Sequence, residues 1–193
     1  MDPHIPTRDE AYALLREFNQ TDKAIKHALA VEAAMRHFAA QRNQDVEKWG
    51  IIGLIHDLDY EQFPSQHCVK TRQILTDRNY PPDYIRAVLS HGFGHCTDVE
   101  PVHEMEKILF AIDELTGLII AATLVRPSRS LDDLEVKSVR KKWKEKSFAA
   151  GVDRSVIERG SAMCNIPLDS LIAETIAALR PIAAALGLQR ATG

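Results

Sequence analysis

Apolar residues recur every three or four positions along most of the chain, which is the spacing of helices that bury one face. An acid-rich turn follows Thr7, and Thr21 stands where an N-cap is expected before the next apolar run. Ser65 is likewise expected to cap a helix, and Pro82 suits the first position of another. The pattern therefore predicts helices after Thr7 and Thr21, over about residues 45–57, after Ser65, from Pro82, and over about 104–125, 153–159 and 168–186.

The longest predicted helix, about residues 104–125, carries Ile, Leu and Ala on several faces, so we expect it to be central and buried. Pro127 should end it, and Pro181 should kink or break the last helix. Alternating strand-like runs and Asn-Gly or Asp-Gly hairpin signals are missing from the sequence. We therefore predict an all-α fold in a single domain over 1–193, with a core at about 8–126 and a C-terminal helical extension at about 127–193.

Composition is that of an ordinary globular protein, with 45% hydrophobic and 26% charged residues among 193. Lys and Arg number 24 against 27 Asp and Glu, a net charge of −3, which argues against a nucleic acid polymer as partner. The three cysteines form no CxxC motif, so neither a disulfide framework nor a cysteine zinc site is expected. With no signal-peptide pattern and no apolar run near the ~20 residues of a membrane span, we expect a cytoplasmic protein with no membrane partner.

Several histidines and one aspartate occupy positions that are unusual for polar side chains. His27 lies near the apolar side of its helix, His56-Asp57 end an otherwise apolar helix, and Asp113 interrupts a long apolar run. Each has an ordinary explanation when taken alone, since a lone histidine is often a core residue and Asp113 can pair with Lys107. Together they favour a metal site, because helical bundles build such sites from inward side chains on facing helices.

The order His27…His56-Asp57…Asp113 resembles the H…HD…D pattern of the HD superfamily of metal-dependent phosphohydrolases. Residues 51–61 are similar to the end of that family's central helix, and the resemblance extends over about 20–125. Residues 113–118 and 141–148 also resemble a branch of small bacterial HD proteins. The resemblance implies an HD-domain-like helical bundle that binds metal.

Carried over to this sequence, the resemblance implies that His27, His56, Asp57 and Asp113 hold a first metal ion. It also identifies two further ligands, His67 and His91, for a second ion, with Asp57 as the bridge between the two. This nitrogen and oxygen donor set suits Mn, Fe, Co, Ni or Zn, and Mg is possible at a more oxygen-rich position. We expect one or two such ions as cofactors.

The implied activity is that of a phosphoric ester hydrolase that uses metal-activated water on a small phosphate-bearing molecule, such as a phosphate ester or nucleotide. Two alternatives stay open: an HD-fold di-iron oxygenase with the same six ligands, and a non-catalytic module that senses a ligand or metal. The cyclic-di-nucleotide phosphodiesterase branch carries adjacent histidines and a Gly-Tyr-Pro signature. This chain has His-Gly-Phe-Gly-His over residues 91–95 instead, which argues against that activity.

The sequence also contains weaker candidates for the site, in addition to this ligand set. Asp59 and Glu61 follow the His-Asp pair closely and are candidates to orient water or protonate a leaving group, or else are solvated loop acids. Candidate substrate contacts are His95, which a loop position explains equally well, Arg126 and Lys70.

A basic run occupies residues 137–146, with six Lys and Arg in ten positions. Such a run can receive phosphate groups when it lies beside a metal site. Most runs of this kind are solvated helix faces, so both interpretations stay open. Neither the substrate nor the oligomeric state follows from the sequence.

Overall fold

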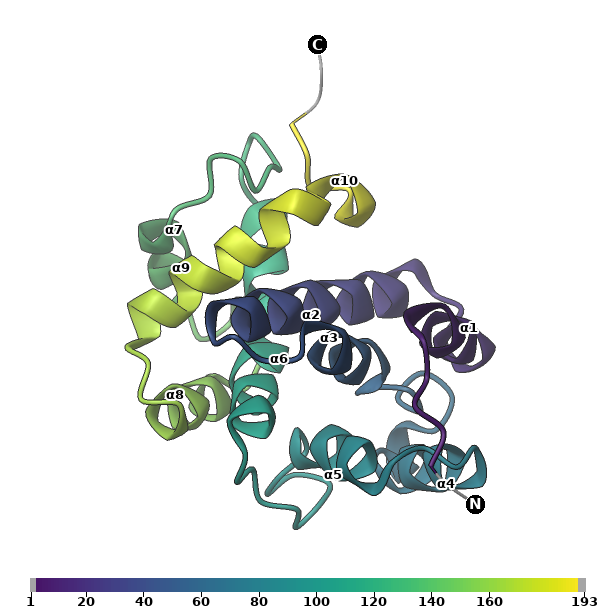
Figure 1. Cartoon of the computed structure of the whole chain (residues 1–193). Helices are drawn as coiled ribbons and strands as arrows, with labels where there is room; N and C mark the ends of the chain where they lie inside the picture. The colour runs from purple at the N-terminus through teal and green to yellow at the C-terminus, as the bar shows by residue number, and fades with distance from the viewer. Residues whose placement is uncertain (1–2, 191–193) are drawn as a thin grey trace. The chain divides into compact units, whose positions relative to one another are not determined.

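Helices account for all the regular secondary structure in the computed structural model, which describes residues 3–190 (Figure 1). The only β-type pairing within that range is one isolated bridge between Phe93 and Thr97. The predicted all-α fold class is therefore confirmed. In chain order the elements are α1 (Arg8–Phe18), α2 (Asp22–Gln41), α3 (Val46–Ile55), the 3-10 helix η1 (Pro64–Gln66), α4 (Val69–Asp77), α5 (Pro82–Ser90), α6 (Glu104–Leu124), α7 (Val136–Trp143), α8 (Arg154–Met163), α9 (Leu168–Leu179), the 3-10 helix η2 (Arg180–Ile182) and α10 (Ala183–Leu186).

The chain forms two compact units that divide within α6, the first ending at Phe110 and the second beginning at Ala111. This division falls earlier than residue 127, where the C-terminal extension was predicted to begin. The single-domain organisation stays a prediction.

The first unit is built around the packing of α2 against α3, which lie side by side in Figure 1. The α2 side chains of Met35 and Phe38 are fully buried, as are Ile52 and Ile55 of α3. α1 and α5 each pack on α3, and α4 packs on α5. The end of α3 is thereby held in the interior of this unit.

Gly53 allows the backbones of α2 and α3 to approach closely. A Cβ at this position would lie 3.0 Å from the carbonyl oxygen of Val31 and 3.2 Å from the Cα of Glu32, both backbone atoms of α2. Backbone atoms cannot move aside as a flexible side chain can, so the extra methyl group must push the two helices apart.

We therefore expect Gly53→Ala to lower the free energy of unfolding by about 1–3 kcal/mol, the usual cost of overpacking. Gly117 in α6 is a matched helical control, because a Cβ there would meet only Val152 Cγ2 at 3.9 Å. Gly117→Ala should instead stabilise the protein slightly through helix propensity. Urea denaturation of both variants checks the prediction, and equal effects would contradict it.

Most predicted helix starts are confirmed. Thr7 and Glu10 form a capping box at α1, and the hydroxyl of Thr21 accepts the backbone N–H of Ala24 at the start of α2. Pro82 is the first residue of α5, as expected. The regular caps therefore follow local sequence signals.

The predicted cap at Ser65 is wrong. Ser65 lies inside η1, and α4 begins only at Val69, after Cys68, whose φ of 68° places it in the left-handed region. The carboxylate of Asp59, from outside the helix, accepts the N–H of Thr71 in the first turn of α4 at 2.8 Å. Val69, the first residue of this helix, is apolar but 62% exposed. A tertiary contact thus replaces the local cap.

The second unit contains the rest of α6 and the helices α7 to α10. A Cβ on Gly160 of α8 would lie 2.4 Å from the Cα of Ala111, so these two helices are in close backbone contact. Pro181 lies in η2, which separates α9 from α10 and confirms the predicted break. The guanidinium of Arg154 donates to the carbonyls of Trp143 and Phe148 and so closes the loop after α7.

Among the described residues, no single helix combines the length and apolar composition of a membrane span. Two consecutive helical segments, α8 and Leu168–Leu186, reach the length and apolar composition of a span only when taken together, and the chain bends sharply between them.

Candidate metal centre

Two pairs of imidazoles and one carboxylate converge in the first unit. His27 of α2 and His56 at the end of α3 form one pair, with 3.2 Å between their Nε2 atoms. The Oδ2 atom of Asp57 lies 3.5 Å from His27 Nε2 and 3.6 Å from His56 Nε2. Three potential ligand atoms thus face a common space, as expected for a metal position.

His67 and His91 form the second pair, with their Nε2 atoms 3.1 Å apart. The other carboxylate oxygen of Asp57, Oδ1, lies 3.4 Å from His67 Nε2 and 3.3 Å from His91 Nε2. Each oxygen of Asp57 therefore serves a different histidine pair. This geometry fits the predicted role of Asp57 as a bridge, which stays a prediction.

His56 and His91 are oriented by the same local device. Each residue is the C-cap of its helix, and each directs Nδ1 at the carbonyl three residues earlier: His56 at Gly53 O, 2.8 Å away, and His91 at Val88 O, 2.5 Å away. Carbonyls in the last turn of a helix lack the usual N–H partner four residues later and are free to accept from other groups. Since a carbonyl only accepts, Nδ1 carries the proton and Nε2 presents its lone pair to the site.

Asp59 orients His67 in a comparable way. Its side chain is 0% exposed, and Oδ1 accepts from His67 Nδ1 at 2.7 Å while Oδ2 accepts from Thr71 N. Carboxylate–histidine pairs of this kind support metal-binding imidazoles in many sites. The contacts of Asp59 favour a positioning role, and a catalytic role for it stays a prediction.

The second histidine pair, His67 and His91, is arranged so that a cation can lie between its two Nε2 atoms. With their Nδ1 protons committed, His67 and His91 face each other through two lone pairs, which repel unless a proton or metal ion lies between them. Burial opposes charging of His67, but the hydrogen bond to Asp59 and the neighbouring Cys96 and Asp57 raise the pKa of His67 to about 10. The hydroxyl of Thr71 is also buried without a partner among the described residues. The donor set therefore fits divalent metal ions.

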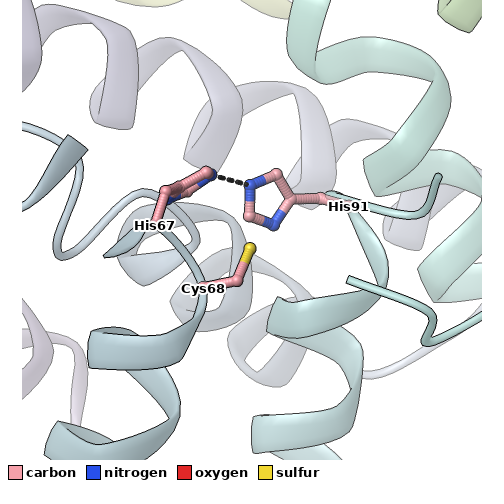
Figure 2. A group of neighbouring side chains, drawn as sticks. All are labelled: His67, Cys68 and His91. Carbon is pink, nitrogen blue, oxygen red and sulfur yellow. Dashed lines mark hydrogen bonds between the residues drawn. The ribbon is translucent and has the colours of Figure 1, made fainter. Parts of the chain in front are cut away.

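Cys68 adds a sulfur to the second pair. One ligand atom from each of His67, Cys68 and His91 lies within 4.8 Å of the others, and Figure 2 shows the thiol pointing toward the two imidazoles. Sequence reasoning passed over Cys68 because it is not part of a CxxC motif. Its place directly after His67 was the available signal.

The other candidates of the first unit lie outside this cluster of ligand atoms. The carboxylate of Glu61 accepts from the hydroxyl and N–H of Thr21 and from the N–H of Gln20, contacts that lower the pKa of Glu61 and tie it to the start of α2. Lys70 lies in the first turn of α4, where its Nζ donates to Gln73 and stands over the Phe63 ring. His95 is exposed in the loop after α5. Their roles in catalysis or substrate binding stay predictions.

Asp113 and Arg126 belong to the second unit, and their relation to the histidine pairs stays a prediction. Asp113 lies in α6, where its carbonyl accepts the hydroxyl of Thr116. Arg126 donates to Ser138 and to the carbonyl of Asp133 and forms an ion pair with the Asp133 carboxylate.

Several members of the basic run pair with nearby acids. Lys137 contacts Glu135, Arg140 contacts Asp169 and Lys142 contacts Glu145. These pairs favour the interpretation of the run as a solvated helix face.

Residues 24–118 match the family model of the HD domain. The matched segment contains both histidine pairs, Asp57 and Asp113. The chain therefore carries an HD domain and belongs to the HD superfamily. This superfamily is of the metal-dependent phosphohydrolase type, and its members bind divalent metal ions. Comparison with curated proteins gave no match, and neither did comparison with solved structures.

Proposed function

We propose that this protein is a metal-dependent hydrolase of a small phosphate ester or nucleotide. The observation that carries the proposal is the single carboxylate of Asp57, whose two oxygens face two separate histidine pairs. Such a geometry supports two neighbouring cations, a recurrent arrangement in phosphoryl-transfer enzymes. We further propose that the protein acts in the cytoplasm on a free small molecule, without a membrane or nucleic acid partner.

In this proposal His27, His56 and Asp57, with Asp113, hold the first ion, and His67, His91 and Asp57 hold the second. Divalent ions bound there would lower the pKa of a bound water molecule and stabilise negative charge on a phosphoryl group. The imidazole donors suit Mn, Fe, Co, Ni or Zn, with Mg at a more oxygen-rich position.

The chain's own groups prepare the ligands for this task. The carbonyls of Gly53 and Val88 hold protons on Nδ1 of His56 and His91, and Asp59 does so for His67. These three histidines therefore need no change of tautomer when a cation enters. Lys70 follows His67 by three residues and lies in the first turn of α4. We propose Lys70 as a contact for the phosphate of the substrate, together with His95 and Arg126.

The second histidine pair also supports the alternative of a di-iron oxygenase, because imidazole and carboxylate ligands suit iron equally well. A ligand-sensing module is the remaining alternative. The three functions differ in metal content and in turnover, so one set of measurements separates them.

The test combines elemental analysis of untagged protein with reconstitution. The protein is stripped with a chelator, reloaded separately with Mn, Co, Ni, Zn, Mg or Fe, and assayed for phosphate release from nitrophenyl phosphate and nucleoside monophosphates. We expect activity that is lost on chelation and restored by at least one non-iron metal, with metal-only samples as blanks. Two irons per chain with substrate-dependent oxygen uptake and no phosphate release would favour the oxygenase. Metal binding without any turnover would favour the sensing module.

A further inference from the structure

Two thiols of the first unit lie in direct contact beside the second histidine pair. The Sγ atoms of Cys68 and Cys96 are 2.8 Å apart, although the two residues are separated by 28 positions in the chain. Both thiols are reduced in the structure. We propose that Cys68 and Cys96 form a peroxide-responsive thiol pair that closes to an intramolecular disulfide next to His67 and His91.

The distance between the sulfurs favours bond formation. A disulfide bond is about 2.05 Å long, so the two atoms need to approach each other by only roughly 0.8 Å. Gly92 makes the contact possible, because a Cβ there would lie 2.3 Å from Cys96 Sγ and 2.9 Å from Cys68 Sγ. A glycine at this position thus leaves room for both sulfurs over one stretch of backbone.

The backbone around each thiol is well ordered by hydrogen bonds. The N–H groups of Cys96 and Thr97 both donate to the carbonyl of Gly92, and the N–H of Gly94 donates back to Thr97 O. Cys68 precedes α4, and its carbonyl accepts the N–H of Arg72. The two thiols therefore face each other from two hydrogen-bonded segments, namely the loop that contains Cys96 and the start of α4 after Cys68.

Unequal exposure assigns the two thiols different parts in the reaction. Cys96 is partly exposed, whereas Cys68 is 2% exposed. The sulfur of Cys96 attacks a peroxide oxygen, the O–O bond breaks, and one water leaves as Cys96 becomes a sulfenic acid. Cys68 then attacks that sulfur and releases a second water. In total, two thiols and one hydrogen peroxide give one disulfide and two waters.

The disulfide links the two segments that carry the ligands of the second histidine pair. Cys68 directly follows His67, and Cys96 belongs to the loop that begins at His91. Oxidation therefore adds a covalent link between the residue after His67 and a residue five positions after His91. A cross-link across 28 positions also restricts the unfolded chain, so the oxidised protein should unfold at a higher temperature.

The experiment treats the reduced full chain with equimolar hydrogen peroxide and then alkylates it under denaturing conditions. We expect intact mass spectrometry to show the loss of two hydrogen atoms and peptide mapping to join Cys68 to Cys96. Cys164 of the second unit should stay open to alkylation. The thermal midpoint should rise by several degrees and return after treatment with dithiothreitol.

Two variants make the result decisive. Cys164→Ser is the matched control and should form the disulfide as the wild type does. Cys96→Ser should form no disulfide and show no shift of the thermal midpoint after peroxide. The proposal is overturned if the wild type gains oxygen on single cysteines, forms dimers through Cys164, or keeps all three thiols.

Discussion

Replacing Asp57 with asparagine should abolish phosphate ester hydrolysis and reduce the bound metal at both positions. Asparagine keeps one oxygen but replaces the other with an NH2 group, which cannot donate an electron pair to a cation. Because each oxygen of Asp57 faces a different histidine pair, no rotation of the amide restores both. Loss of a supporting partner alone costs ~10–100-fold, so we expect a loss of activity beyond about a hundredfold.

The measurement is metal content and phosphate release for Asp57→Asn beside the wild type. Asp77→Asn is a matched control, since Asp77 is an exposed residue at the end of α4. Circular dichroism should give the same helix content for all three proteins. If Asp57→Asn retains both metal and activity, the bridging role and the proposed hydrolase mechanism are both refuted.

Replacing Asp59 with asparagine should weaken binding of one metal equivalent by ~10–100-fold while leaving the other equivalent in place. Asp59 accepts two N–H groups, from His67 Nδ1 and Thr71 N, and an amide can accept only one of them. His67 then loses the contact that fixes its ring, or α4 loses its cap. Only the second histidine pair contains His67, so the first should keep its metal.

Measuring kcat of Asp59→Asn at limiting and at saturating metal concentrations separates a positioning role of Asp59 from a catalytic one. If Asp59 positions His67, saturating metal should restore most of kcat in Asp59→Asn. A catalytic acid would leave kcat low at saturating metal and remove one limb of the pH–rate profile. Glu61→Gln is the matched control: Glu61 contacts Thr21 and Gln20 rather than a histidine, so metal affinity should not change.

The helical framework could be predicted because its signals are local. Periodic apolar residues, the capping threonines and Pro82 act within one or two turns, and the structure places α1, α2, α3, α5 and α6 close to the predicted bounds. The start of α4 could not be predicted in this way. Its cap is the carboxylate of Asp59, 12 residues before Thr71, and Ser65 carried a stronger local signal.

The candidate metal residues divide along the same line. His27, His56 and Asp57 were identified by their order in the sequence, and His67 and His91 by the same resemblance. The resemblance also implied their division into two pairs bridged by Asp57, and the packing of several helices places each pair beside a different oxygen of that carboxylate. No spacing in the sequence determines which oxygen faces which imidazole.

By itself, the sequence determined the helical class of this protein, most helix boundaries and a set of metal-binding candidates, because those features depend on residues that are near in the chain or on a recognisable motif order. Only the tertiary structure decided that Asp59 supports His67, that Glu61 belongs to the start of α2, and that Cys68 contacts Cys96. These contacts join residues that are distant in sequence or that lie in irregular turns. Their geometry arises when helices pack against one another, a process that local patterns do not encode.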